Sequence, residues 1–189
     1  MSTTNSRPQG FTLIEVLITL VIIAIGVLGL AALQGRSHLS AAESAQRAQA
    51  VALINDMASR ININRADVEN YVTATPLGTG TADADCTLLA PGKDRDQCEW
   101  SELLKGAAEE RGATKTGAMI GAKGCVEVVQ TANPAPTICR PAIVRITTAW
   151  QGLVESAAPA LTCGKGAYGD DTLRRAVATQ VIVGLPRCI

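Results

Sequence analysis

Residues 10–33 read GFTLIEVLITLVIIAIGVLGLAAL, and this stretch sets the arrangement of the whole chain. Between Phe11 and Leu33 the only charged side chain is Glu15. A run of about 20 apolar residues is long enough to span a bilayer as a helix. A carboxylate in such a helix costs about 2.5–3.5 kcal/mol near the bilayer centre and less close to an interface. Glu15 is therefore expected to have a function and a partner.

Two ordinary kinds of N-terminal segment explain this stretch less well. A signal peptide has a basic start, an apolar core of roughly 7–15 residues and a small-residue cleavage site after that core. Here the preceding residues carry one cation, Arg7, the apolar core is longer, and residues 31–34 form a poor cleavage site. A plain membrane anchor would explain the apolar length but not Glu15.

The string Gly10-Phe11-Thr12-Leu13-Ile14-Glu15 resembles the motif of type IV pilins and of the pseudopilins of type II secretion. The resemblance implies that residues 1–10 are a prepilin leader, which a dedicated peptidase removes by cutting between Gly10 and Phe11. It also implies that Phe11 is then N-methylated. Glu15 would pair with the free N-terminal amine of a neighbouring subunit during assembly. Opposite charges attract far more strongly in a medium of low dielectric than in water.

The chain continues as a predicted helix beyond the apolar stretch. From Gln34 to about Arg65 there is no proline, and the only glycine is Gly35. The apolar positions at helical spacing are Leu39, Ala42, Ala50, Leu53, Ile54, Met57 and Ile61, and the charged positions expected in water are Arg36, Glu43, Arg47, Asp56 and Arg60. A continuous helix from Phe11 to Ile63 would be about 80 Å long. Residues 11–33 are therefore predicted to lie in membrane or fibre, and residues 34–65 to pack on a head.

A second stretch is similar to one group within this family. Residues 50–65, AVALINDMASRININR, and the following Tyr71 are similar to the end of the long helix in the PilV minor pilins. Major pilins commonly carry a proline where this chain has Ala32, so local melting of the helix in a fibre would depend on Gly26 and Gly29. Close helix packing is the alternative interpretation of these two glycines.

Residues 66–189 are predicted to form an α+β head, in which the long helix packs on a small antiparallel sheet. Residues 73–85 are expected to be loop. Asp96 and Glu99 resemble a capping box, which predicts a helix from Cys98 to Arg111 ended by Gly112. The expected strands are Val126–Gln130, Ala142–Trp150 and Ala176–Val183, with a turn at Gly121–Gly124 before them. Connections through Asn133-Pro134 and through residues 164–171 would make these strands antiparallel.

Six cysteines follow the apolar stretch: Cys86, Cys98, Cys125, Cys139, Cys163 and Cys188. Such a content in a chain of 189 residues indicates an oxidising compartment, here the periplasm. Six cysteines allow fifteen pairings. Pairing of nearest neighbours is the preferred hypothesis: Cys86–Cys98, Cys125–Cys139 and Cys163–Cys188. A metal site is disfavoured because no C-x-x-C pair occurs.

The composition argues against several classes of function. Lys and Arg (17) balance Asp and Glu (17), so a direct nucleic-acid binder is not expected. The single histidine, His38, is expected on the helix surface. Calcium is a minor alternative for Asp94, Asp96 and Glu99, and a metal for Asp170 and Asp171, which are more simply turn residues. No phosphate-binding motif or enzymatic constellation is apparent, so no catalytic residue, cofactor or metal is expected.

The resemblance implies a minor pilin in a tip or priming complex that promotes pilus assembly, and so twitching motility, adhesion and DNA uptake. Its partners would be other minor pilins, the major pilin, the prepilin peptidase and the inner-membrane assembly platform. The chain would span the inner membrane once, with its head in the periplasm, and then enter the fibre at the cell surface. Three alternatives stay open: a minor pseudopilin of type II secretion, a membrane-anchored periplasmic enzyme or binding protein, and an adhesin that uses the loop at residues 73–85.

Overall fold

The computed structural model describes residues 11–106, 110–111, 114–115, 117, 119–135 and 137–185. The chain divides at Ala42 into two compact units, an N-terminal segment and a head that starts at Glu43. Helix α1, Leu13–Ile63, contributes to both units. The absence of proline and the many alanines in this stretch favour the helical conformation, and Asn64, which follows Ile63, is a poor helix former.

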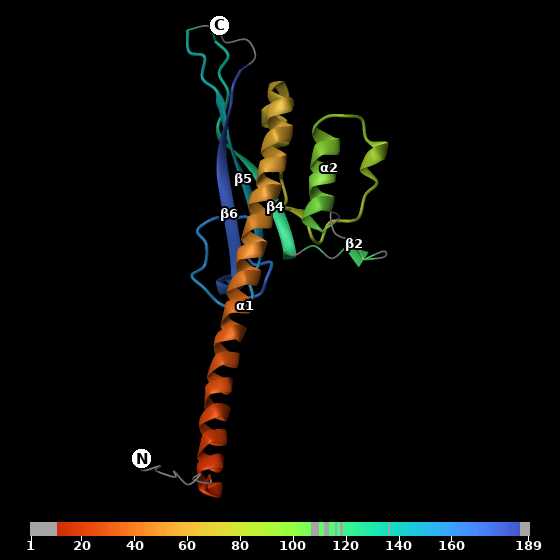
Figure 1. Cartoon of the computed structure of the whole chain (residues 1–189). Coiled ribbons are helices and arrows are strands. Elements are labelled where there is room, and N and C mark those ends of the chain that lie inside the picture. The colour runs from red at the N-terminus through yellow and green to blue at the C-terminus, as the bar shows by residue number, and fades with distance from the viewer. Residues whose placement is uncertain are drawn as a thin grey trace, which may run out of the picture. The chain divides into compact units, whose positions relative to one another are not determined.

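The head is built around a four-stranded sheet with helices packed on it (Figure 1). Its regular elements after α1 are η1 (Arg65–Tyr71), β1 (Leu77–Gly78), η2 (Cys86–Leu88), α2 (Lys93–Leu104), β4 (Ile120–Gln130), β5 (Ala142–Gln151), η3 (Asp171–Leu173) and β6 (Arg174–Val183). The sheet has the order β1-β4-β5-β6, and every neighbouring pair is antiparallel. Two short strands, β2 (Glu110–Arg111) and β3 (Thr114–Lys115), pair separately. The predicted α+β class is confirmed.

The core lies between the second half of α1 and one face of the sheet. Alternate residues of β5 supply the sheet side, and they are Ala142, Val144, Ile146, Thr148 and Trp150, all buried as the alternation predicted. The buried residues on α1 are Gln46, Ala50, Leu53, Ile54, Met57 and Ile61. Burying a large aliphatic side chain contributes about 1.5–3 kcal/mol. Leu39 and Ala42, which were expected on the same helix face, are exposed.

Helix α2 begins and ends earlier than the sequence indicated. It runs Lys93–Leu104 rather than from Cys98 to Arg111, and Gly92 occupies its N-cap position. Asp96 lies inside the helix and does not cap it, because its side chain turns toward α1 instead. Lys105 follows the last turn, Arg111 belongs to β2, and Gly112 lies outside the described residues.

The segment Gly121–Gly124 belongs to strand β4 and is not a turn. An irregularity in the β4–β5 pairing lies between Ile120 and Lys123, and the left-handed Gly121 (φ 63°) accommodates it. Gly124 has a different reason to be glycine. A Cβ atom there would lie 2.3 Å from the Trp100 ring and 2.6 Å from Leu104 Cδ1. Gly121 therefore accommodates the irregular pairing, and Gly124 allows close packing of α2 on the strand.

Replacing Gly124 with Ala is expected to destabilise the head by about 1–3 kcal/mol, the usual cost of overpacking a core. Trp100 is fully buried, and its indole N–H donates to Leu53 O at 2.9 Å, so the ring has little freedom to move. Denaturant unfolding of the full chain in detergent, followed by tryptophan fluorescence, would measure the change. Gly184→Ala is the matched control because a Cβ there would meet nothing within 4 Å. Equal stability of the two variants would contradict the predicted close packing at Gly124.

Disulfides join parts of the head that lie far apart in sequence. Cys86 and Cys98 are bonded as predicted, with their Cα atoms 5.6 Å apart. The predicted pairing of Cys125 with Cys139 is wrong, because Cys125 is bonded to Cys163 with a Cα separation of 5.9 Å. Cys163 is thereby excluded from a bond to Cys188. Cys139 is also disulfide-bonded, and Cys188 lies outside the described residues.

The strand register explains why the nearest-neighbour pairing fails. Cys125 lies in the middle of β4 opposite Thr147 on β5, whereas Cys139 lies in the connection beyond the end of β4. The five steps along the strand from Cys125 to Gln130 extend roughly 17 Å. A disulfide requires Cα atoms within about 7 Å. The long β5–β6 connection instead places the Cys163 sulfur 3.9 Å from Thr147 O.

Arg174 holds this β5–β6 connection against the sheet. Its buried guanidinium donates to the carbonyl oxygens of Pro159 at 2.9 Å and Cys163 at 3.1 Å, and it forms an ion pair with Asp171 at 2.7 Å. The hydrogen bond from Arg174 lowers the pKa of Asp171. The neighbouring Asp170 accepts a hydrogen bond from the backbone of Thr172 at 2.9 Å. Both aspartates therefore have structural roles in this connection.

Candidate assembly interface

The first turn of α1 presents the only acidic group of the apolar stretch. Helix α1 begins at Leu13, and Glu15 lies in its first turn. The Glu15 N–H approaches Thr12 O at 3.1 Å and Thr12 Oγ1 at 3.4 Å. A carboxylate in the first turn of a helix is stabilised by the helix dipole. The geometry thus keeps Glu15 at the N-terminal end of α1, four residues after Phe11. Gly10, the other half of the predicted cleavage site, lies outside the described residues.

The residues around Glu15 present an apolar surface on all sides of the helix. Every residue from Phe11 to Leu33 is exposed, and Phe11 itself is 83% exposed. One window of 18 residues in α1 has a mean hydropathy of 3.0 and no buried residue within the structure. Soluble monomers rarely expose a continuous apolar area of this kind. This half of α1 therefore needs a membrane or other protein chains to cover it.

An ion-pair cluster fastens the end of α1 to α2. Arg60 donates to Asp56 at 2.8 Å on its own helix, and to Glu99 at 2.6 Å and Asp96 at 3.3 Å on α2. The Arg60 side chain is only 20% exposed, although the sequence pattern predicted it to face water. Burial works against its charge, yet the hydrogen bonds with Glu99 and Asp56 raise its pKa overall. Arg60, Asp96 and Glu99 are thus structural residues.

Tyr71 and Asn64 extend this cluster to η1. The Tyr71 hydroxyl donates to Asp96 Oδ2 at 2.5 Å, and the Asn64 amide donates to the same oxygen at 2.8 Å. Burial, together with the hydrogen bond to Asp96, raises the pKa of Tyr71. The stretch that resembled the end of the long helix in PilV minor pilins, with its following Tyr71, therefore joins the end of α1 and η1 to α2. Sequence pattern alone did not reveal that these residues meet Asp96.

Two further polar contacts join α1 to the sheet. The Trp150 indole N–H donates to Gln46 Oε1 at 3.1 Å, and Arg175 on β6 pairs with Glu43 at 3.1 Å. Both helix residues lie one to two turns before the buried apolar face. These directional contacts fix which face of α1 meets the sheet.

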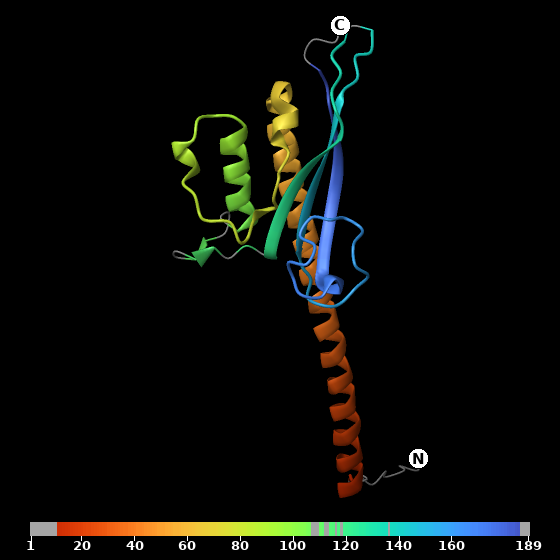
Figure 2. The ribbon, with the colours of Figure 1, turned by 180° about the vertical axis from the view of Figure 1, so that it is seen from behind.

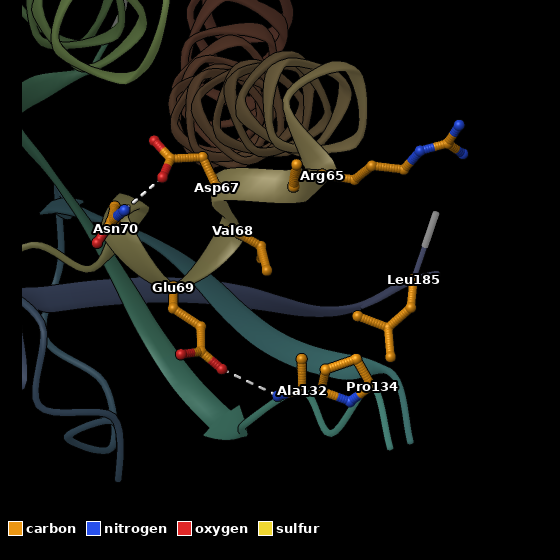
Figure 3. Close-up of a pocket in the computed structure, with 9 residues that line it drawn as sticks. Arg65, Asp67, Val68, Glu69, Asn70, Ala132, Pro134 and Leu185 are labelled. Atoms are coloured by element: carbon orange, nitrogen blue, oxygen red, sulfur yellow. Dashed lines mark hydrogen bonds between the residues drawn. The ribbon is translucent and has the colours of Figure 1, made fainter. Parts of the chain in front are cut away.

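A hollow with a volume of about 410 Å³ lies on the head between η1 and the β4–β5 connection (Figure 3). Residues 65–70, Ala132, Pro134 and Leu185 line it. Glu69 accepts a hydrogen bond from the Ala132 N–H at 3.0 Å, and Asn70 donates to Asp67. The labelled Arg65 side chain points away from the other lining residues. The polar groups here hold η1 to the connection.

The remaining residues that the sequence offered as sites are exposed or engaged in ion pairs. His38 is exposed on α1. Asp94 pairs with Lys93 at 2.8 Å, while Asp96 and Glu99 are engaged by Arg60. Within the part of the chain that the structure describes, no group of three or more His, Cys, Asp or Glu side chains is arranged to hold a metal ion. The alternatives of calcium or another metal gain no support from these contacts.

Two family models match consecutive parts of the sequence. The model described as "Prokaryotic N-terminal methylation motif" matches residues 5–31, and the model described as "Type IV pilin Tt1218" matches residues 32–105. No curated protein and no solved structure gives a significant match. The first model covers the apolar half of α1 with Glu15, and the second runs from the rest of α1 through α2. With its N-terminal motif and a long helix packed on an antiparallel sheet, this chain belongs to the type IV pilin family.

Proposed function

We propose that this chain is a minor pilin of a type IV pilus and belongs to a tip or priming complex that promotes pilus assembly. The prepilin peptidase cuts between Gly10 and Phe11, and Phe11 becomes the N-methylated first residue. The chain then spans the inner membrane once with its head in the periplasm. The assembly platform transfers it into the fibre at the cell surface, where it acts by binding other pilins and catalyses nothing.

The observation that carries the proposal is one carboxylate, Glu15, in residues 11–33, which are otherwise uncharged and are all exposed. In a fibre core or membrane an unpaired carboxylate is costly, and so is an unpaired N-terminal ammonium group. Pairing the two groups from neighbouring subunits lowers both costs and fixes the stagger between adjacent helices. Assembly of neighbouring helices also buries the apolar residues around Glu15.

The role of a minor pilin is supported by the junction between α1 and the head. Residues 50–65 and Tyr71 resemble the corresponding part of PilV minor pilins, and here they form the contacts to α2. Other minor pilins and the major pilin are the proposed partners. Twitching motility, adhesion and DNA uptake would then depend on the chain through pilus number, without direct binding of nucleic acid.

A minor pseudopilin of a type II secretion system is the second candidate, because the same N-terminal motif serves both machines. A clean deletion of the gene, scored in parallel for surface pili and for secreted protein, separates them. We expect a loss of most surface pili with normal secretion, restored by expressing the intact chain in trans. Lost secretion with normal pili would instead assign the chain to the secretion system and overturn the proposal.

A further inference from the structure

The two edges of the head sheet differ in how they are covered. At the β1 edge, the Gly78 N–H donates to the buried Ser101 hydroxyl of α2 at 3.0 Å. The Gly78 carbonyl accepts hydrogen bonds from the N–H and the hydroxyl of Thr81 at 3.1 and 2.8 Å. Helix α2 and the turn at residues 78–81 therefore close this edge to any further strand.

Among the residues that the structure describes, none covers the β6 edge in this way. Strand β6 pairs with β5 at every position from Arg174 to Val183 without a register shift. In an antiparallel pair, every second residue directs its backbone N–H and C=O groups away from the partner strand. Among the described residues, β5 is the only hydrogen-bonding partner of the backbone groups at 176–183. Figures 1 and 2, seen from opposite sides, both show β6 at the border of the sheet.

The side chains along this edge do not protect it. Natural proteins guard free edges with short strands, charged side chains, proline or bulges, since unpaired backbone groups invite another strand. Strand β6 has ten residues, no bulge, and neither a charge nor a proline from Ala176 to Leu185. Thr179 and Gln180 are exposed, and Ile182 is 66% exposed. An isolated head would carry this edge as an aggregation hazard.

The two charges at the start of β6 are already paired within the head. Arg174 is buried and bound to Asp171, and Arg175 donates to Glu43 at 3.1 Å and to Val154 O at 2.6 Å. An incoming strand would therefore meet no unpaired cation within β6 itself, residues 174–183. A charged side chain opposite residues 176–183 would lose water without gaining a counter-ion. The edge matches an uncharged strand.

We propose that residues 176–183 of β6 form a strand-addition surface, which pairs with an extended, uncharged segment of another pilin subunit. Backbone hydrogen bonds supply the pairing, and the small and apolar side chains of β6 select a partner without charges. The identity of the partner class rests on the proposed function, under which the neighbours of this chain in the complex are other pilins. A second copy could not pair through its β1 edge, because α2 covers that edge.

Site-specific photo-cross-linking in the native cell tests this surface. A photoreactive phenylalanine analogue is placed at Gln180 of the full chain, and at Leu88 as a control that is 82% exposed away from the sheet edge. We expect one adduct at Gln180, with a cross-linked peptide that maps to an uncharged segment of another pilin, and no such adduct at Leu88. Equal labelling at both positions, no adduct at Gln180, or an adduct with a second copy of this chain would each overturn the proposal.

A charge variant then separates strand pairing from simple proximity. Thr179→Lys combined with Ile182→Lys introduces charges on both faces of the edge strand, and Leu88→Lys is the control for an exposed apolar side chain. The double variant is expected to lose the Gln180 adduct while the disulfides and the protease resistance of the head stay intact. An adduct that persists would contradict strand addition. Normal pili after gene deletion would count against the proposed function alone, because the adduct is scored independently of pilus number.

Discussion

Replacing Glu15 with Ala is expected to leave the chain processed and membrane-inserted but to exclude it from pili. The substitution removes the only charge between Phe11 and Leu33, so nothing would remain to neutralise the N-terminal ammonium group of the neighbouring subunit. Breaking a buried ion pair costs about 3–5 kcal/mol, which corresponds to a loss of at least about a hundredfold in the incorporation equilibrium. The measurement is the amount of this chain in sheared pili relative to the amount in membranes.

Two further variants make that result specific. Glu15→Gln keeps the size of the side chain and removes only its charge, so it should fail like Glu15→Ala. A Gly10→Leu variant should stay uncut, and its mass gives the reference for an unprocessed chain. Incorporation of Glu15→Ala at the level of the unmodified chain would remove the assembly role of Glu15, whatever the effect on processing.

Replacing both Cys125 and Cys163 with Ser is expected to destabilise the head by about 4 kcal/mol. The bond closes a loop of sequence separation 38 and ties the long β5–β6 connection to the middle of β4. In the chain-entropy model, the free energy gained from a disulfide grows with the logarithm of the loop length. A loss of about 4 kcal/mol is a large share of the 5–15 kcal/mol that typically stabilises a domain. Denaturant unfolding of the full chain in detergent would measure it.

The Cys86–Cys98 bond offers a matched comparison within the same head. Its sequence separation is 12, so the same model gives a smaller loss of about 3 kcal/mol for the double serine variant. Limited proteolysis should distinguish the two variants by location, with early cleavage in residues 152–173 for the first and in residues 79–92 for the second. A Cys125/Cys163 variant as stable as the unmodified head would contradict the structural role assigned to that bond.

At the end of α1 the sequence pattern predicted the buried residues but not the polar contacts. Helical spacing placed Leu53, Ile54, Met57 and Ile61 on one face, and all four are buried. The same reasoning put Arg60 in water, but Arg60 contacts Asp96 and Glu99 on α2. A local pattern reports which face of a helix is apolar. It carries no information on which distant carboxylates approach the polar border of that face.

The capping-box prediction at Asp96 failed for the same reason. Asp and Glu three residues apart do mark many helix starts. In this chain Asp96 contacts Arg60 and Tyr71, and Glu99 contacts Arg60. The helix begins earlier, at Lys93. Gly121 and Gly124 were similarly ambiguous, since glycine serves turns and close packing alike. At Gly124 the reason is close packing against Trp100, and the position of Trp100 depends on the packing of α2 against β4.

The sequence by itself determined the properties that depend on neighbours along the chain: the apolar half of the long helix, the place of Glu15 in it, the burial of alternate residues on β5, and the α+β class. Tertiary structure alone decided the Cys125–Cys163 bond, the cluster around Arg60 and the contrast between the closed β1 edge and the open β6 edge. The physical reason is separation in sequence. Periodicity and spacing act over a few residues, whereas these contacts join segments whose distance is set only when the helix and all four strands have packed together.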